Sequence, residues 1–167
     1  MNDGKYLRFS KGSPESKALL DWWRGLENNR GDRAVLRRCR SLTEVVFVPS
    51  YHRLRQELLR LGNVDSDGLA ITAGLAAHVK VINAEHTLAK QMALPKAGGT
   101  ARVSGLRFRR LLKIEGREDM YHAMIRIVAL LGGALNLISL AESVYWWNDL
   151  TRKNWAFDYY TNAPSEK

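Results

Sequence analysis

The sequence contains a single cysteine, Cys39, among 167 residues. One thiol excludes a disulfide within the chain and a zinc ribbon built on paired Cys-x-x-Cys motifs, so we expect a packed, reduced side chain. Long apolar runs are also missing. The longest, residues 127–141, includes Asn136 and Ser139 and falls short of the ~20 residues that a membrane-spanning helix needs. Residues 1–11 lack the apolar core of a secretory signal, and we therefore expect a soluble, cytoplasmic protein.

Motifs for catalysis and for cofactor binding are missing as well. The four histidines form no i, i+4 pair and no HExxH motif. The sequence also has no phosphate-binding loop, no GxGxxG motif and no GxSxG motif. We therefore expect no metal ion, no cofactor and no enzymatic activity. The enzymatic alternative is a small ribonuclease that uses His78 or His122 as general acid and base.

Acidic residues are scarce in two short segments that hold the whole charge imbalance. The chain has 26 Lys and Arg against 17 Asp and Glu, a net charge of +9 and a pI of about 9.9. Residues 30–40, the first basic segment, hold five arginines and one acid, Asp32. Residues 102–113, the second basic segment, hold four arginines, one lysine and no acid. A polyanion is the expected partner, and nucleic acid fits better than a membrane, because exposed Trp and Leu do not adjoin these segments.

The spacing within the basic segments indicates a binding face for a phosphate backbone. Arg30, Arg33, Arg37 and Arg40 lie three or four residues apart, which places them on one side of a predicted helix over 32–40. Like charges on one face repel, and a polyanion removes this repulsion and releases counterions. Arginine also suits phosphate oxygens, whereas no Asn or Gln is placed to read bases. We expect sequence-independent binding, with both segments on a common exposed flank, by Arg30, Arg33, Arg37, Arg38, Arg107, Arg109, Arg110 and Lys113.

Apolar residues recur at helical spacing along most of the chain. The sequence therefore predicts an all-α protein, a compact bundle of about eight helices. The bundle is either continuous or divided into two helical halves, 13–93 and 104–161, joined by a linker at 94–103 that contains Pro and Gly. The tryptophans fall among leucines at helical spacing, so we expect them in the core or at an interface rather than stacked on bases.

Individual segments give more local predictions. Ser13 and Ser104 are typical helix N-caps, and Ser50 is a third candidate. Two long helices are predicted. One is alanine-rich, opens at the turn formed by residues 65–68 and either ends before Met92 or runs on to it, and the other covers roughly 134–149. Residues 44–48 are ambiguous between a short strand and a helix.

The order of motifs in the C-terminal third resembles a known family. The motifs are a basic helix with Arg107-Phe108 and Leu112, a helix with Arg126 and Leu130, a Gly132-Gly133 break, a helix with Asn136-Leu137 and Leu140, and a terminal Trp155-Ala156 with Tyr159-Tyr160. In this order they resemble the CasB family, the small subunit of the type I-E CRISPR Cascade complex. Residues 22–38 resemble the opening helices of that family, whereas residues 62–100 are not diagnostic.

The resemblance implies an all-helical protein without enzymatic activity of its own. Two copies are expected to lie head to tail in the complex, in contact with its backbone subunits and its large subunit. There they stabilise the guide RNA and the target and displaced DNA strands. A different class of function stays open, namely a stand-alone helical DNA-binding regulator, which needs a recognition helix with base-reading side chains.

Overall fold

The protein is built almost entirely of α-helices, as the sequence predicts. The computed structural model describes residues 5–165, so residues 1–4 of the N-terminal segment lie outside the described part. Within that range there are ten helices: α1 (Pro14–Asn28), α2 (Arg30–Arg37), α3 (Leu42–Val46), α4 (Pro49–Leu59), α5 (Ser66–Ala76), α6 (Leu88–Ala93), α7 (Gly105–Leu112), α8 (Arg117–Leu130), α9 (Leu137–Tyr145) and α10 (Asp149–Asn162). Two short strands, β1 (Val81–Ile82) and β2 (Ala134–Leu135), pair in parallel.

Polar side chains fix where most of these helices begin. The predicted caps at Ser13 and Ser104 are confirmed, because their hydroxyl oxygens accept from backbone N–H groups three residues later, at 3.1 and 3.3 Å. The predicted cap at Ser50 is wrong, since Pro49 begins α4 and Ser50 lies buried inside it. Proline is favoured at a first helical position because its missing N–H has no partner there in any case. The other side-chain caps are Asn29, Ser41, Asp65, Thr87, Asn136 and Asn148.

The alanine-rich helix predicted after the turn at 65–68 does not run on to Met92. It is divided into α5 and α6 by β1 and the turns beside it. The division is a tertiary effect, because the backbone N–H groups of Lys80 and Asn83 donate to the carbonyls of Gly133 and Leu135, at 2.8 Å in each case. A local sequence pattern carries no signal for this pairing, since the partners are far apart in the chain.

Three further segments differ from the sequence prediction. The predicted helix 32–40 is α2, which begins at Arg30 and ends at Arg37. The predicted helix 134–149 begins later, because residues 134–135 form β2 and Asn136 caps α9. Most of the ambiguous segment 44–48 lies in or directly after the helix α3. The short helices α3 and α6 bring the number of helices within residues 5–165 from the predicted eight to ten.

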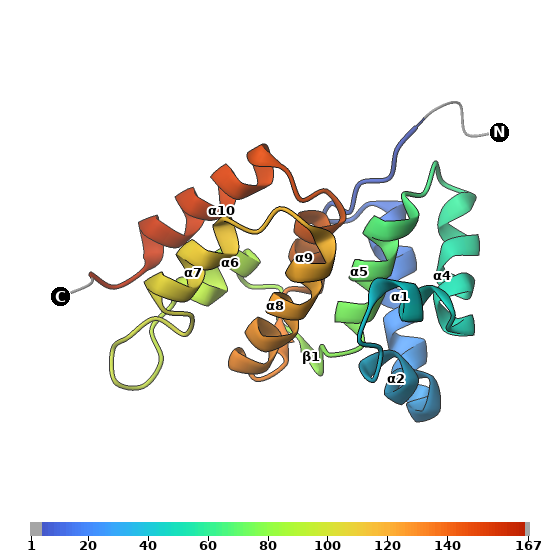
Figure 1. Ribbon diagram of the computed structural model, residues 1–167, viewed down its shortest axis with the longest axis horizontal. Helices are drawn as coiled ribbons and strands as arrows, with labels where there is room; N and C mark the ends of the chain where they lie inside the picture. Colours follow the sequence, from blue (N-terminus) through green and yellow to red (C-terminus); the bar gives the residue numbers. More distant parts are fainter. Residues whose placement is uncertain (1–4, 166–167) are drawn as a thin grey trace.

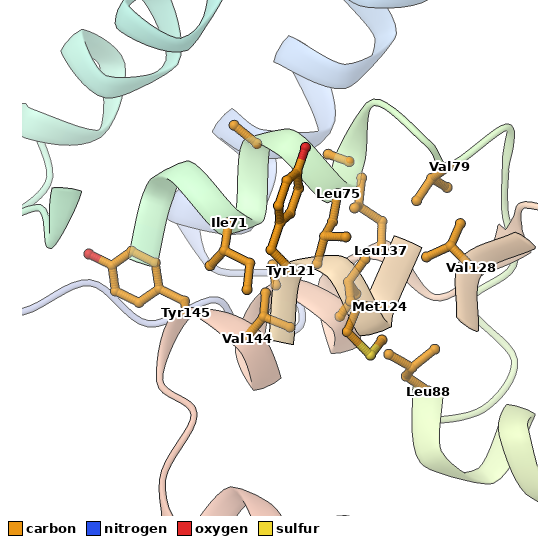
Figure 2. Close-up of a cluster of buried hydrophobic side chains, with 14 of the residues drawn as sticks. Ile71, Leu75, Val79, Leu88, Tyr121, Met124, Val128, Leu137, Val144 and Tyr145 are labelled. Carbon is orange, nitrogen blue, oxygen red and sulfur yellow. The ribbon is translucent and has the colours of Figure 1, made fainter. Parts of the chain in front are cut away.

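The centre of the protein is α5, whose residues from Gly68 to Ala76 are all buried. This helix packs against α3, α8 and α9. Glycine allows the close approach, because a Cβ on Gly74 would lie 2.8 Å from the ring of Tyr121. Figure 2 shows side chains of α5, α8 and α9 meeting in one apolar cluster, in which Leu75, Tyr121 and Leu137 are prominent. The N-terminal and C-terminal parts of the chain thus contribute to a common core.

Helices α1, α2 and α4 lie towards one end of the molecule, and α6, α7 and α10 lie towards the other (Figure 1). α6 packs against α10. Phe108 of α7 stacks on Tyr159 of α10, with ring centroids 3.9 Å apart and planes inclined by 6°. α6 therefore contacts a helix of the second predicted half although it precedes the linker. The division into halves 13–93 and 104–161 around 94–103 stays a prediction.

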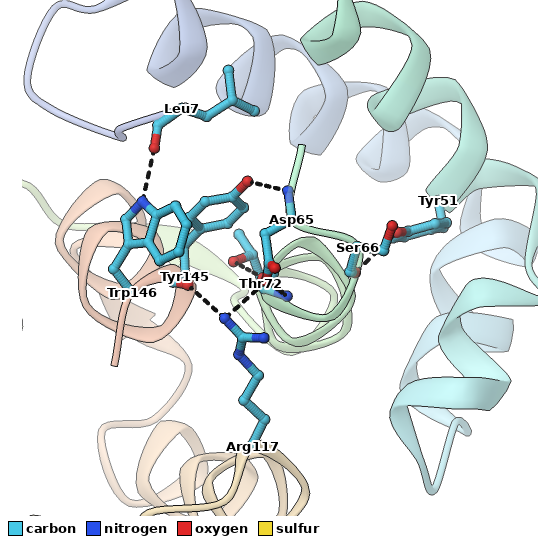
Figure 3. Close-up of polar contacts among 9 residues, drawn as sticks. Leu7, Tyr51, Asp65, Ser66, Thr72, Arg117, Tyr145 and Trp146 are labelled. Carbon is cyan, nitrogen blue, oxygen red and sulfur yellow. Dashed lines mark hydrogen bonds and ion pairs between the residues drawn. The ribbon is translucent and has the colours of Figure 1, made fainter. Parts of the chain in front are cut away.

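The N-terminal segment joins two loops at one side of the core. The indole N–H of Trp146, directly after α9, donates to the carbonyl of Leu7 at 2.8 Å (Figure 3). The backbone N–H of Asn63, before α5, donates to the carbonyl of Lys5 at 2.7 Å. The side chains of Leu7 and Phe9 are buried. Residues 5–9 are therefore part of the packed structure rather than a loose extension.

Candidate nucleic-acid interface

The first basic segment forms α2 and the turn that follows it. Its inner side is apolar, with Leu36 and Cys39 buried. The predicted packed thiol is confirmed, and burial, followed by the charge of Glu44, raises the pKa of Cys39 above its ordinary value. The predicted stripe of arginines divides into two groups by exposure. Arg30, Arg38 and Arg40 are exposed, whereas Arg33 and Arg37 are half-buried.

The half-buried arginines cap the C-terminal end of α5. Arg33 donates from Nε to the carbonyl of Ala77 at 3.2 Å and from Nη2 to the carbonyl of Val79 at 2.6 Å. Arg37 donates from Nε to the same Ala77 carbonyl at 2.7 Å. Cations at this position satisfy carbonyls that lack helical partners and interact favourably with the helix dipole. Sequence reasoning missed this structural role, because the spacing of the arginines does not reveal what lies beneath them.

The residue between these two carbonyls, His78, shares the same environment. Burial, then the charges of Arg37 and Arg33, lower the pKa of His78 below its ordinary value of 6.5. The imidazole is therefore neutral at pH 7. Burial also lowers the pKa of Arg33, with the charge of Arg37 as the next cause. The end of α5 thus holds two neighbouring guanidinium groups beside an uncharged histidine.

Acidic side chains near the first basic segment are bound to other groups. The carboxylate of Asp32 is paired with the guanidinium group of Arg53 from α4. The carboxylate of Glu44 accepts from the backbone N–H of Arg40 at 2.5 Å rather than from an arginine side chain. Within residues 5–165, no carboxylate pairs with the guanidinium groups of the five arginines in this segment. The guanidinium groups of these five arginines therefore form no ion pair within the described part of the chain, although the charge of Glu27 acts favourably on Arg33.

The second basic segment forms α7, the three residues before it and its C-cap, Lys113. Phe108 and Leu111 are buried and attach α7 to the core. The last turn carries Arg109 and Arg110, whose charges match the negative end of the helix dipole. All the predicted site residues of this segment are exposed: Arg107, Arg109, Arg110 and Lys113.

The two basic segments lie towards opposite ends of the molecule, with α2 at one end and α7 at the other (Figure 1). Helices of the shared core lie between them along the length of the molecule, and the expected common exposed flank stays a prediction. A polyanion in contact with both segments has to extend along the length of the protein. An extended nucleic-acid strand has this shape, whereas a small anion does not.

The tryptophans belong to the folded structure, as the sequence predicts. Trp23 and Trp155 are buried, and the other three pack against the core. All five indole N–H groups donate to acceptors within the chain, at distances of 2.7 to 3.2 Å. Their packing and hydrogen bonds account for these residues without a role in base stacking.

Other kinds of site have little basis in the structure. In the part of the chain that the structure describes, no group of three or more His, Cys, Asp or Glu side chains could hold a metal ion. None of the helices within residues 5–165 is both long and apolar enough to cross a membrane. Of the two histidines considered for acid–base catalysis, His78 is half-buried at the end of α5, and His122 lies 3.6 Å from Glu118 on α8.

Comparison with known proteins supplies independent information. Residues 32–160 match the family model described as CRISPR-associated protein Cse2. No curated protein sequence matches the chain at a significant level.

Solved structures share the arrangement of the helices. A chain of E. coli Cascade, bound to a PAM-containing dsDNA target, superposes with a TM-score of 0.66 at 20% identity, over 87% of this chain and 94% of that one. CasB from Thermus thermophilus gives 0.67 at 21% identity, over 89% of this chain and 99% of that one. A Cse2-family protein from Thermus thermophilus gives 0.66 at 24% identity, with the same coverage. At these identities the likeness is one of fold.

Proposed function

Because the chain belongs to the Cse2 family of CRISPR-associated proteins, we propose that it is a non-catalytic, nucleic-acid-binding subunit of a type I-E CRISPR Cascade complex. In this role it holds guide RNA and the target and displaced DNA strands by their sugar-phosphate backbones. It sits beside other Cascade subunits and a second copy of itself. Base pairing between guide and target reads the sequence, and the protein contributes contacts that do not depend on sequence.

The observation that carries this proposal is the state of the exposed basic side chains. Three exposed arginines lie on α2 and the turn after it, and three exposed cations on α7 and its C-cap. None of the six has a carboxylate partner within residues 5–165: Arg30, Arg38, Arg40, Arg107, Arg110 and Lys113. Phosphate groups can supply these partners, and each neutralised phosphate releases counterions. The planar guanidinium group binds phosphate oxygens through two N–H donors, which favours arginine over lysine at such a surface.

The half-buried arginines have a second part in this proposal. Arg33 and Arg37 fasten α2 to the end of α5 through three hydrogen bonds to backbone carbonyls. This attachment fixes the position of the helix that carries Arg30. The guanidinium groups of Arg33 and Arg37 also contribute positive charge to the surface, but the main effect of these two residues is to hold α2 in place.

The shape of the protein favours binding of an extended nucleic-acid strand over binding of a compact ligand. The basic segments are separated by the core helices along the length of the molecule (Figure 1). The likeness in fold to a chain of E. coli Cascade bound to dsDNA supports the assembly part of the proposal. A subunit of such a complex needs an elongated surface that follows nucleic acid, and two basic ends provide it.

The test compares two quadruple alanine variants in binding to a fluorescent single-stranded DNA of mixed sequence, measured by anisotropy at several salt concentrations. The first variant replaces Arg30, Arg38, Arg107 and Arg110. For single strands the slope of log K against log salt falls by about 0.7 for each lost phosphate contact, so we expect a decrease of up to about 2.8. The control replaces four other exposed cations, which leaves the same net charge: Lys11, Lys17, Arg60 and Arg126.

The two variants distinguish a localised site from general charge. We expect the control to keep a slope close to that of the unmodified protein. Equal weakening in both variants, or no weakening in the first, contradicts the proposed interface. Strong preference for one duplex sequence supports the stand-alone regulator instead. Cleavage of added RNA that disappears in His78→Ala or His122→Ala contradicts the non-catalytic role.

A further inference from the structure

A groove of about 920 Å³ lies between the N-terminal segment, α9 and α10, away from the two basic segments. Tyr6, Arg8 and Phe9 of the N-terminal segment line it together with side chains of α9 and α10. Trp146 and Asp65 line it as well, and Figure 3 shows both residues where the N-terminal segment meets the end of α9. Neither the fold nor the proposed binding of nucleic acid explains why this groove is present.

The rim of the groove carries large apolar side chains that are exposed to solvent. Three of the four most exposed large apolar side chains in residues 5–165 line it: Tyr6 (63% exposed), Leu150 (62%) and Phe157 (71%). Leu150 and Phe157 are at positions i and i+7 of α10, so they share one face of the helix. Asn154, between them, lines the groove as well. Exposed apolar side chains gathered in one place, rather than scattered, are typical of a surface that binds another protein.

The charge in the groove is opposite to that of the protein as a whole. Asp65, Glu142 and Asp158 line it together with one cation, Arg8, although the chain has a net charge of +9. Asp65 is paired with Arg117 at 2.8 Å. In the described part of the chain, no cation pairs with Glu142 or Asp158. These carboxylates repel a phosphate backbone and attract a positively charged partner.

We propose that this groove is the docking site of a protein segment that combines apolar anchors with lysine or arginine. The anchors pack between Tyr6 and Phe157 above the indole of Trp146, and a cationic side chain pairs with Glu142. An amphipathic helix satisfies both requirements, because its anchors recur at helical spacing and its charges flank them. Nucleic acid and this protein segment therefore occupy different parts of the molecule, and the groove does not depend on the function proposed above.

The chemistry of the partner is tested first with a random peptide library displayed on phage. The full-length protein selects binders, and those that also bind Phe157→Ala are removed. We expect the remaining peptides to be rich in Leu, Ile, Phe, Lys and Arg and poor in Asp and Glu. Enrichment of acidic peptides, or a selection in which no binder depends on Phe157, overturns the proposal.

A synthetic peptide from this selection then measures the contribution of single side chains by fluorescence anisotropy. We expect Phe157→Ala to weaken binding about tenfold or more, because anchoring aromatic residues dominate such interfaces. Glu142→Gln should weaken binding and reduce its dependence on salt. The matched controls are Phe47→Ala, an aromatic residue that is 75% exposed, and Glu115→Gln, both outside the groove, and neither should change the affinity. Equal losses in Phe47→Ala and Phe157→Ala overturn the assignment.

Two measurements separate the alternative occupants. Sedimentation of the protein alone detects a dimer, and a dimer that disappears in Phe157→Ala assigns the groove to a second copy and overturns the proposal. Displacement of the peptide by single-stranded DNA assigns the groove to nucleic acid and also overturns the proposal. The quadruple variant at Arg30, Arg38, Arg107 and Arg110 should bind the peptide normally, so a failure of nucleic-acid binding and a failure of peptide binding are distinguishable.

Discussion

The two groups of arginine in the first basic segment should respond differently to mutation, and Arg33→Ala against Arg38→Ala measures the difference. Arg33 donates hydrogen bonds to the carbonyls of Ala77 and Val79, at 3.2 and 2.6 Å, at the end of the central helix α5. Arg38 is exposed and has no such bonds within residues 5–165. The first substitution therefore removes part of the folded structure, and the second removes only surface charge.

The size of the effect follows from the bonds that are lost. A hydrogen bond from a charged donor contributes about 1.5–3 kcal/mol. Because Arg33 is half-buried, water replaces part of this, and we expect a total loss of about 2 kcal/mol for Arg33→Ala. In a chain of this length that corresponds to a decrease in Tm of about 4–8 °C. Arg38→Ala should change the free energy of unfolding by less than about 0.5 kcal/mol.

Thermal unfolding followed by far-ultraviolet circular dichroism measures both variants, and anisotropy with single-stranded DNA measures their binding. Arg33→Lys is a useful third variant, because it keeps the charge but loses the planar fork that reaches two carbonyls. We expect its Tm to lie between those of Arg33→Ala and the unmodified protein. Equal Tm values for Arg33→Ala and Arg38→Ala, or a lower value for Arg38→Ala, would refute the structural role of Arg33.

Three further substitutions test the core and the pH dependence. Gly74→Ala should destabilise the protein by about 1–3 kcal/mol in urea unfolding, because the new Cβ lies 2.8 Å from the ring of Tyr121; an unchanged midpoint would show that the helices can separate without loss. Phe108→Ala should cost about 3–5 kcal/mol in the same assay, since the side chain is fully buried and stacks on Tyr159; a loss near zero contradicts its anchoring role. His78 has a lowered pKa in the folded state, so the unfolded chain binds its proton first as the pH falls below 6.5. The free energy of unfolding should therefore decrease below that pH, and it should decrease less in the His78→Gln variant than in the unmodified protein. Identical pH profiles of urea unfolding for the two proteins contradict this.

Much of the fold follows from the sequence because the interactions involved are local. Ser13 and Ser104 cap helices through backbone groups three residues away, and apolar spacing marks the buried face of α8 and α10. The order of the motifs after residue 106 is local information of the same kind, read segment by segment. The predicted family is confirmed by the match over residues 32–160, and the predicted helical fold by its likeness to CasB.

The candidate interface is only partly predictable for the same reason. Exposure of Arg30, Arg38 and the basic residues of α7 follows from amphipathic spacing, since the opposite face of each helix is apolar. The burial of Arg33 and Arg37 does not, because it depends on α5 ending beneath them. The ion pair between Arg53 of α4 and Asp32 of α2 cannot be predicted either, because it depends on how these two helices pack.

The sequence by itself determined the helical class, the family, the starts of α1 and α7 and the two segments that carry the net charge. Only the tertiary structure decided that β1 and β2 divide a predicted helix, that the basic segments lie towards opposite ends, and that Tyr6, Glu142 and Phe157 line one groove. Caps and helical periodicity involve residues within about one turn of each other, so the sequence records them directly. Strand pairing, the end of α5 beneath Arg33 and the walls of the groove depend on which distant segments meet, and this is settled by packing around the shared core.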